Sequence, residues 1–196
     1  MPLKIAVTGN MGSGKTTVCQ IFEVLGVPVF YADKQAKSIL NSHEVLPQLI
    51  EIFGTGIINS KGNIDRQKLA SIVFTDREKL DQLNHIIHPK VYEKFDQWVK
   101  QQTLAPYCLM EAAIIFESGS QERFDKTILV SAPLEVMRDR VIERDHTSET
   151  EVMNRMKNQM PQEEKIKLAD HHVINDGKTL VIPQIIKMDM IFKSKY

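Results

Sequence analysis

The chain has 196 residues and a mass of 22.4 kDa, and its 25 basic and 25 acidic side chains give a formal net charge of +0. This balance argues against a protein that coats nucleic acid or an anionic membrane. The two cysteines lie in apolar stretches without a C-x-x-C pair, which argues against a zinc ribbon or a disulfide scaffold. No stretch approaches the ~18 apolar residues of a membrane span, and the amino terminus resembles a strand rather than a signal sequence. We therefore expect a cytoplasmic protein.

Short runs rich in Val and Ile alternate with longer amphipathic stretches, a pattern typical of an α/β protein with a parallel sheet. Strands are predicted at residues 3–8, 27–31, 107–115, 126–131 and 172–175. A first helix is predicted at 15–25, closed by Gly26, and another runs from 133 to about 144. A capping box at 148–151 opens a short helix that ends before Pro161, and a last helix follows the turn at 175–177.

The stretch from about residue 33 to 102 has a helical pattern with no candidate central strand, so we interpret it as a helical insertion. Within it, residues 75–78 form a capping box that opens one helix, and Pro89 suits the first position of another. We expect one domain with three parts. These are a core (about 1–32, 103–136 and 162–196), the insertion (about 33–102) and a lid (about 137–161).

Residues 9–16 read GNMGSGKT and fit the phosphate-binding pattern G-x-x-x-x-G-K-[ST] between a predicted strand and a predicted helix. Such glycines let backbone N–H groups wrap an anion, and the helix dipole adds positive potential. The lysine neutralises the β and γ phosphates, and the threonine hydroxyl binds Mg²⁺. The loop therefore predicts a purine nucleotide triphosphate with magnesium. Its predicted binding residues are Gly9, Asn10, Met11, Gly12, Ser13, Gly14, Lys15, Thr16 and Thr17.

Asp33 follows the second predicted strand. The carboxyl ends of parallel strands face one crevice, so this carboxylate is expected near the γ phosphate. There it would accept the proton of an attacking hydroxyl or orient that hydroxyl. The alternative is an N-cap for the following helix.

Glu111 lies among apolar neighbours in the third predicted strand, where a carboxylate is costly unless it meets a cation or strong donors. Holding Mg²⁺ through water would satisfy it, and Glu117, just beyond the strand, is the competing carboxylate.

The segment from 138 to 155 is rich in arginines. A kinase must shield the transferring phosphoryl group from water and neutralise its charge, which an arginine-bearing lid does. Arg140 and Arg155 are the candidates, whereas Arg138 is interpreted as part of a solvated helix face. The histidines have no metal-ligand spacing, and His85 and His88 are interpreted from the residues alone as helix-end packing.

Over essentially its whole length, the chain resembles the dephospho-CoA kinase family. The segment TGNMGSGKTTV is similar to the family's TGGIGSGKSTV, and YADKQAK, which contains Asp33, matches its D-A-D element. GNIDRQKLASIVF and LNHIIHPKV are similar to segments that shape the acceptor pocket, which implies that Arg66 and His88 contact the substrate. The lid segment carries Arg155 and Gln159 in the family's R-x-x-x-Q pattern, and Asn175 falls in the turn that lines the adenine site.

The resemblance implies a P-loop α/β/α kinase of the nucleoside-monophosphate-kinase type, with a five-stranded parallel sheet, an acceptor-binding insertion and a lid. It implies transfer of the γ phosphoryl group of ATP to the ribose 3′-hydroxyl of dephospho-CoA, with Mg²⁺ as cofactor and Asp33 as base. Lys15, Arg140 and Arg155 would stabilise charge, and Thr16 and Glu111 would hold the metal. The sequence leaves the oligomeric state open.

There is one departure from the family pattern. Where the family reads D-x-P-L-L-F-E, the chain has EAAIIFE, with Glu111 for Asp and Ala113 for Pro, which bears on metal geometry rather than on the reaction. Two other functions stay open: a P-loop kinase of another small metabolite or nucleotide, and a nucleotide-dependent switch. Against a switch, the chain has no N-K-x-D and no D-x-x-G segment, and Asp33 would have no evident task.

Overall fold

The computed structural model describes residues 1–73 and 75–194, and the chain divides into two compact units. The first unit is Met1–Tyr31 together with the chain from Val99 onward, and the second is Ala32–Trp98. The strands are β1 (Leu3–Thr8), β2 (Val29–Tyr31), β3 (Tyr107–Glu111), β4 (Lys126–Ser131) and β5 (His171–Ile174). The α-helices are α1 (Lys15–Val24), α2 (Ala32–Leu40), α3 (Leu46–Phe53), α4 (Arg66–Val73), α5 (Arg77–Gln101), α6 (Leu134–Asp145), α7 (Glu149–Lys157), α8 (Gln162–Leu168) and α9 (Val181–Lys193).

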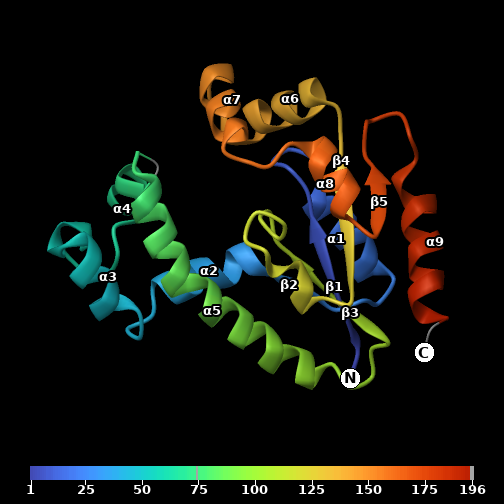
Figure 1. Ribbon diagram of the computed structural model, residues 1–196, viewed down its shortest axis with the longest axis horizontal. Coiled ribbons are helices and arrows are strands. Elements are labelled where there is room, and N and C mark those ends of the chain that lie inside the picture. The colour runs from blue at the N-terminus through green and yellow to red at the C-terminus, as the bar shows by residue number, and fades with distance from the viewer. Residues whose placement is uncertain (74, 195–196) are drawn as a thin grey trace. The chain divides into compact units, whose positions relative to one another are not determined.

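Over the described residues the strands form one five-stranded sheet in the order β2-β3-β1-β4-β5, and every pairing is parallel (Figure 1). This confirms the predicted fold class. At the carboxyl end of β1, Val7 pairs with Glu111 of β3, and Thr8 pairs with Leu129 of β4. Strand β1 lies between β3 and β4, and the chain connects to strands on both sides of it, so the strand order reverses there. A crevice at such a switch point, at the carboxyl ends of the strands, is the usual ligand site of an open α/β sheet.

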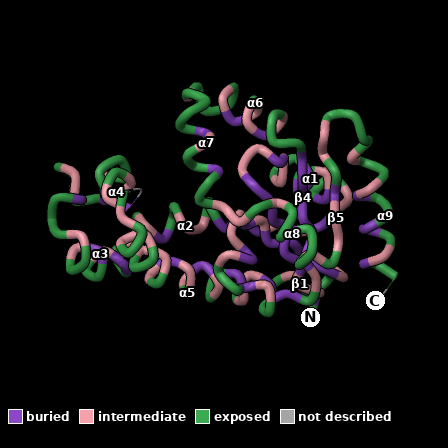
Figure 2. Tube along the Cα trace, turned by 45° about the horizontal axis from the view of Figure 1, so that its top comes forward, coloured by how far each residue is buried: buried purple, intermediate pink, exposed green. Residues whose placement is uncertain are grey.

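The largest apolar core of the first unit lies between the sheet and helices α1 and α9. Alternate strand residues such as Ile5, Val7 and Val130 are fully buried there against Phe22 of α1 and Ile185 of α9. Figure 2 shows the trace of β4 coloured as buried. The core therefore fixes the start of α1 against β1, which positions the loop between them.

A second apolar cluster joins the two helices of the expected lid. Met137 and Val141 of α6 pack with Val152 and Met156 of α7, and the side chain of Met11 packs against this cluster. The loop between β1 and α1 thus shares buried surface with helices α6 and α7.

Three predicted strands begin or end differently in the structure, and for β5 the difference is a shift of one residue, from the predicted 172–175 to His171–Ile174. Strand β2 begins at Val29 rather than residue 27, because the N–H of Val27 bonds the Phe22 carbonyl at the end of α1, and Pro28 has no N–H. Strand β3 ends at Glu111 rather than residue 115, where its neighbour β1 also ends. Gly26 does close α1, with φ of 84° and its N–H on the Glu23 carbonyl.

The prediction that Pro89 begins a helix is wrong, since Pro89 lies inside the 25-residue helix α5. Ile87, Val91 and Phe95 are all buried at four-residue spacing across the proline. Because this stripe of buried apolar side chains continues on both sides of Pro89, packing favours a single helix, even though the proline removes one backbone hydrogen bond.

The capping box at the start of α5 is displaced by one residue. The carboxylate of Asp76, not the hydroxyl of Thr75, accepts a hydrogen bond from the N–H of Lys79. The Thr75 hydroxyl instead donates to the carbonyls of Ser71 and Ile72. Asp76 therefore caps α5.

The second unit has its own small core, with buried Ile39, Leu49, Leu69 and Ile87 from four helices. Among its described residues, the regular structure is helical, and Ile58 and Ile64 form an isolated antiparallel bridge. Among the helices of the described chain, none is long and apolar enough to cross a membrane.

Candidate active site

The loop between β1 and α1 has a backbone that glycine alone fits at two points. Gly12 has φ of 80°, and a Cβ there would lie 2.2 Å from the Met137 carbonyl oxygen of α6. Gly9 has φ of 150°, and a Cβ there would lie 2.3 Å from the Val130 carbonyl oxygen of β4. The loop is therefore held against β4 and α6 at contact distance.

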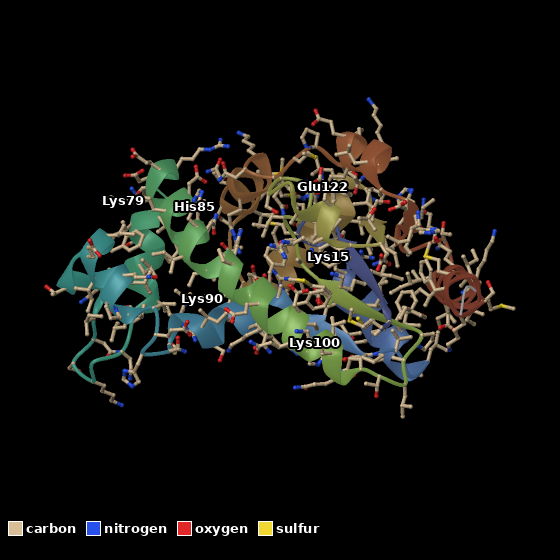
Figure 3. All side chains as sticks on the ribbon, turned by 60° about the horizontal axis from the view of Figure 1, so that its bottom comes forward. Lys15, Lys79, His85, Lys90, Lys100 and Glu122 are labelled. Atoms are coloured by element: carbon tan, nitrogen blue, oxygen red, sulfur yellow. The ribbon has the colours of Figure 1, made fainter. Side chains whose placement is uncertain are left out.

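The loop presents donors in the manner expected of an anion site. The hydroxyl of fully buried Ser13 has no hydrogen-bond partner among the described residues, so its O–H is available to a phosphate oxygen. The Lys15 ammonium, labelled in Figure 3, donates to the carbonyls of Gly9 at 2.9 Å and Asn10 at 3.3 Å. Lys15 and the exposed Thr16 and Thr17 form the first turn of α1.

Thr16 and Glu111 meet at the carboxyl end of the sheet, as the metal-site prediction requires. The Thr16 hydroxyl donates to Glu111 Oε1 at 2.9 Å, and Glu111 is half-buried as the last residue of β3. Burial, reinforced by the negative charge of Glu111, raises the pKa of the nearby Cys19 thiol, so that cysteine is not a nucleophile. A hydroxyl and a carboxylate oxygen side by side suit a hard cation.

Glu117, the competing carboxylate, is engaged elsewhere. Its Oε1 lies 2.6 Å from the ammonium of Lys165, a residue of α8 that is fully buried. The same oxygen accepts a hydrogen bond of 3.2 Å from the N–H of Met160. Of the two carboxylates, Glu111 is the one beside Thr16.

Arg140 of α6 contacts the backbone of the loop. Its guanidinium donates to the Gly12 carbonyl at 3.4 Å and to the Asn175 carbonyl at 3.1 Å. The Asn175 amide in turn donates to the Ser13 carbonyl at 2.8 Å. One cation and one amide from distant parts of the sequence therefore contact the two central residues of the loop.

The two lid residues of the R-x-x-x-Q pattern have different positions. Gln159 reaches the loop, where its Oε1 accepts a hydrogen bond of 2.9 Å from the N–H of Met11. Arg155 instead pairs with Asp145 Oδ2 at 3.1 Å. Hydrogen bonds from Arg144 first and then Arg155 lower the pKa of Asp145. Arg138 pairs with the exposed Asp139 and Glu149, in agreement with a solvated face.

The remaining candidate residues belong to the second unit. Asp33 is exposed in the first turn of α2, and because that helix begins at Ala32, Asp33 is not its N-cap. Arg66 is exposed at the start of α4 and donates to the Lys37 carbonyl at 3.1 Å. His88, on the long helix α5 that also carries His85 (Figure 3), is half-buried, and burial lowers its pKa, so its imidazole is neutral at pH 7.

The family model for dephospho-CoA kinase matches residues 3–180. The chain belongs to the dephospho-CoA kinase family. The dephospho-CoA kinase of Aquifex aeolicus is 42% identical over 175 residues, 89% of each chain. That of Bacteroides fragilis is 37% identical over 189 residues, 96% of this chain and 92% of the relative.

Solved structures agree with membership of the dephospho-CoA kinase family. TT1252 from Thermus thermophilus superposes with a TM-score of 0.87 at 34% identity, covering 97% of both chains. Dephospho-CoA kinase from Campylobacter jejuni superposes with a TM-score of 0.71 at 27% identity, covering all of both chains. A shikimate kinase from Bacteroides thetaiotaomicron, at 15% identity and a TM-score of 0.52, shares the fold.

The sequence did not identify Lys165, whose ammonium pairs with Glu117, as a residue that belongs to the surroundings of the loop at 9–16. Lys165 and Lys167 lie two positions apart in the charged helix α8, and only burial distinguishes them, since the first is fully buried and the second exposed. Helix α8 itself was not predicted, because its seven residues, QEEKIKL, contain only two apolar side chains.

Proposed function

We propose that the chain transfers the γ phosphoryl group of ATP to the ribose 3′-hydroxyl of dephospho-CoA, giving coenzyme A and ADP. The observation that carries the proposal is the family match, which spans the loop, the insertion and the lid. A P-loop kinase needs no dedicated cluster of metal-binding side chains, because the phosphates themselves bind the metal.

The nucleotide would lie on the loop at the carboxyl end of β1. Its phosphates would accept hydrogen bonds from the loop amides and the Ser13 hydroxyl, whose present lack of a partner fits that role. Lys15 would exchange its contacts with loop carbonyls for the β and γ phosphates. Arg140, at 3.4 Å from the Gly12 carbonyl, would neutralise the charge that develops during transfer.

The adenine end and the lid would use three further residues. Gln159 and Asn175, each hydrogen-bonded to the loop, are the proposed contacts on the nucleotide. Arg155 would leave Asp145 to stabilise the phosphoryl group during transfer. Because their ion pair is on the exposed surface, breaking it costs little free energy.

Thr16 and Glu111 fit a magnesium ion, since they place two oxygen donors 2.9 Å apart beside the phosphate site. Bound there with ATP, Mg²⁺ would neutralise negative charge on the phosphates. The family pattern has aspartate at position 111, and a glutamate there can still hold the metal through water.

Asp33 would accept the proton of the 3′-hydroxyl while that oxygen forms a bond to the γ phosphorus. The bond from the γ phosphorus to the bridging oxygen breaks at the same time, and ADP leaves. Asp33 lies two residues beyond the end of β2, and its exposed carboxylate supports this role. Arg66 and the neutral His88 would bind the acceptor. Because both substrates are small and soluble, we place the reaction in the cytoplasm.

An ADP-formation assay tests the proposal with dephospho-CoA, AMP, CMP and shikimate as acceptors. We expect ADP formation with dephospho-CoA and little with the others. Turnover of another acceptor with none on dephospho-CoA would refute the proposed substrate and leave a P-loop kinase of another metabolite.

The substitution Asp33→Asn tests the base. The variant should bind ATP with unchanged affinity, because the carboxylate is assigned to the acceptor, whereas kcat should fall by about 10²–10⁴-fold. Isothermal titration and steady-state kinetics on the same preparation measure both quantities. Asp81→Asn, at an exposed position of α5 in the same unit, serves as the control and should retain activity. Unchanged turnover in Asp33→Asn would remove Asp33 from the mechanism.

A further inference from the structure

The buried ion pair between Glu117 and Lys165 lies outside the reacting groups yet near the nucleotide loop. Lys165 is fully buried, its ammonium lies 2.6 Å from Glu117 Oε1, and it also donates to the Ala113 carbonyl at 3.4 Å. The second carboxylate oxygen of Glu117 is buried without a hydrogen-bond partner in the described part of the chain. The lysine charge has thus been removed from water, and the carboxylate, whose side chain is 19% exposed, largely so, with incomplete compensation.

Stability alone is a poor reason for such a pair. The cost of desolvating two charges is comparable to or greater than their attraction, and apolar pairs of similar volume commonly replace buried ion pairs without loss of stability. The pair is therefore better explained by the groups that it holds in place.

The groups it holds connect directly to the loop. Glu117 Oε1 also accepts from the N–H of Met160 at 3.2 Å, and the Met160 carbonyl accepts from the side-chain amide of Asn10 at 3.3 Å. The neighbouring Gln159 accepts from the N–H of Met11 at 2.9 Å. Residues 159–160, which we call the strap, therefore lie between the carboxylate of Glu117 and the second and third residues of the loop.

The lysine makes a second connection, to the residue that immediately precedes the loop. The Ala113 carbonyl that accepts from Lys165 also accepts from the hydroxyl of Thr8 at 3.3 Å. Thr8 is the last residue of β1, immediately before Gly9. Through the strap and through Ala113, one ion pair thus contacts partners of Thr8, Asn10 and Met11.

We propose that Glu117 and Lys165 are positioning residues for the nucleotide, holding the strap and the start of the loop in the geometry that binds ATP phosphates. Neither residue touches the reacting atoms. Asn10 takes part because it stands where the family pattern has glycine, so this chain has a side-chain bond from the loop to the strap. The proposal rests on the proposed function only in taking ATP as the ligand.

The first test is the double substitution Glu117→Leu/Lys165→Met, which removes both charges and keeps the volume. We expect a folded protein whose affinity for ATP is lower by about tenfold. The KM for ATP should rise while the KM for dephospho-CoA stays within about twofold of wild type. Lys167→Met, on the exposed side of the same helix, is the matched control and should change neither quantity.

A double-mutant cycle with Asn10→Gly separates positioning from general stability. If the pair acts through the strap, removing the Asn10 bond and the ion pair together should weaken ATP binding by less than the product of the two separate effects. Multiplicative effects would mean that the pair does not act through the strap, which overturns the proposal.

Three further outcomes are decisive. A folded double variant with ATP affinity within about twofold of wild type overturns the proposal. The proposal is also overturned if neither this variant nor the milder Glu117→Gln folds, because the ion pair would then be required for the stability of the whole sheet. ATP binding is measured directly with the purified full chain. An inactive wild-type protein whose double variant still loses ATP affinity would therefore refute the dephospho-CoA assignment and leave the positioning role intact.

Discussion

At the scale of single residues, the loop is defined as much by the atoms that surround it as by its own sequence. The motif accounts for glycine at positions 9 and 14, while position 12 is one of its variable positions. The structure supplies a reason for glycine there, because the Met137 carbonyl of α6 occupies the space of a side chain. Gly12 is therefore a contact between the loop and the lid.

Substituting Gly12 by alanine should affect both stability and nucleotide binding. The new methyl group would lie 2.2 Å from the Met137 carbonyl oxygen, at a φ of 80°. We expect a loss of about 3 kcal/mol or more in the free energy of unfolding, or a displaced loop with weakened ATP binding. Chemical denaturation and ATP titration distinguish these results.

Gly119→Ala is the matched control for Gly12→Ala. Gly119 also has a positive φ, of 65°, but a Cβ there would have nothing within 4 Å. This variant should lose only about 1 kcal/mol and keep its affinity for ATP. Equal losses in the two variants would show that backbone conformation, and not the contact with α6, determines the requirement for glycine.

The sequence identifies the residues of the loop well, because a short contiguous motif carries its own chemistry. Lys15, Thr16 and Glu111 were predicted together, and the last two are in direct contact. The ion pair of Glu117 with Lys165 could not be predicted, since the two residues are 48 positions apart and the sequence does not distinguish a buried lysine from an exposed one. Arg155 was expected to stabilise phosphate charge, and its position beside Asp145 leaves that role a prediction.

At the scale of elements, one local signal in the chain is confirmed and another is overridden by burial. The capping box at 148–151 opens α7 as predicted, with the Ser148 hydroxyl accepting from the N–H of Glu151. The signal at Pro89 failed because the buried stripe of α5 continues through it. A proline restricts a helix locally, whereas packing acts along its whole length, so sequence rules located the stretch but divided it wrongly.

The cap of α7 offers a test of the lid. Ser148→Ala should destabilise the protein by about 1 kcal/mol, because an N–H at the start of the helix loses its acceptor. For a chain of this size, that loss corresponds to a decrease in Tm of about 2–4 °C. Thermal unfolding followed by circular dichroism measures it. Thr150→Ala, at an exposed position in the same first turn, should change Tm by less than half as much, and an equal decrease would rule out the cap as the cause.

At the scale of the whole molecule, a neutral chain is expected to bind two polyanions. The net charge of +0 is an average, whereas Lys15 and Arg140 both lie against the loop, from the first turn of α1 and from α6. Local cations and backbone amides are sufficient to bind phosphate groups without a basic surface. The order of the strands in the sheet, by contrast, could not be predicted, because the sequence patterns indicate where strands lie in the chain but not which strands pair.

Nucleotide and metal should stabilise the fold together. At a free ATP concentration 100 times its Kd, with Mg²⁺ present, the free energy of unfolding should rise by about 2.7 kcal/mol. Adding EDTA should remove most of this gain by lowering the affinity for the nucleotide. In Glu111→Ala, the difference between samples with and without EDTA should shrink, while the exposed Glu122→Ala should behave as wild type. Full metal dependence in Glu111→Ala would place the ion elsewhere.

The order β2-β3-β1-β4-β5 has a consequence for biosynthesis. Strand β1 is made first, but its two neighbours, β3 and β4, begin at Tyr107 and Lys126. At about 5–20 residues per second, a ribosome needs roughly 5–20 s to supply the first of them. During that interval β1, the apolar strand that precedes the loop, has no partner in the sheet, so its pairing begins only after more than half of the chain has been translated.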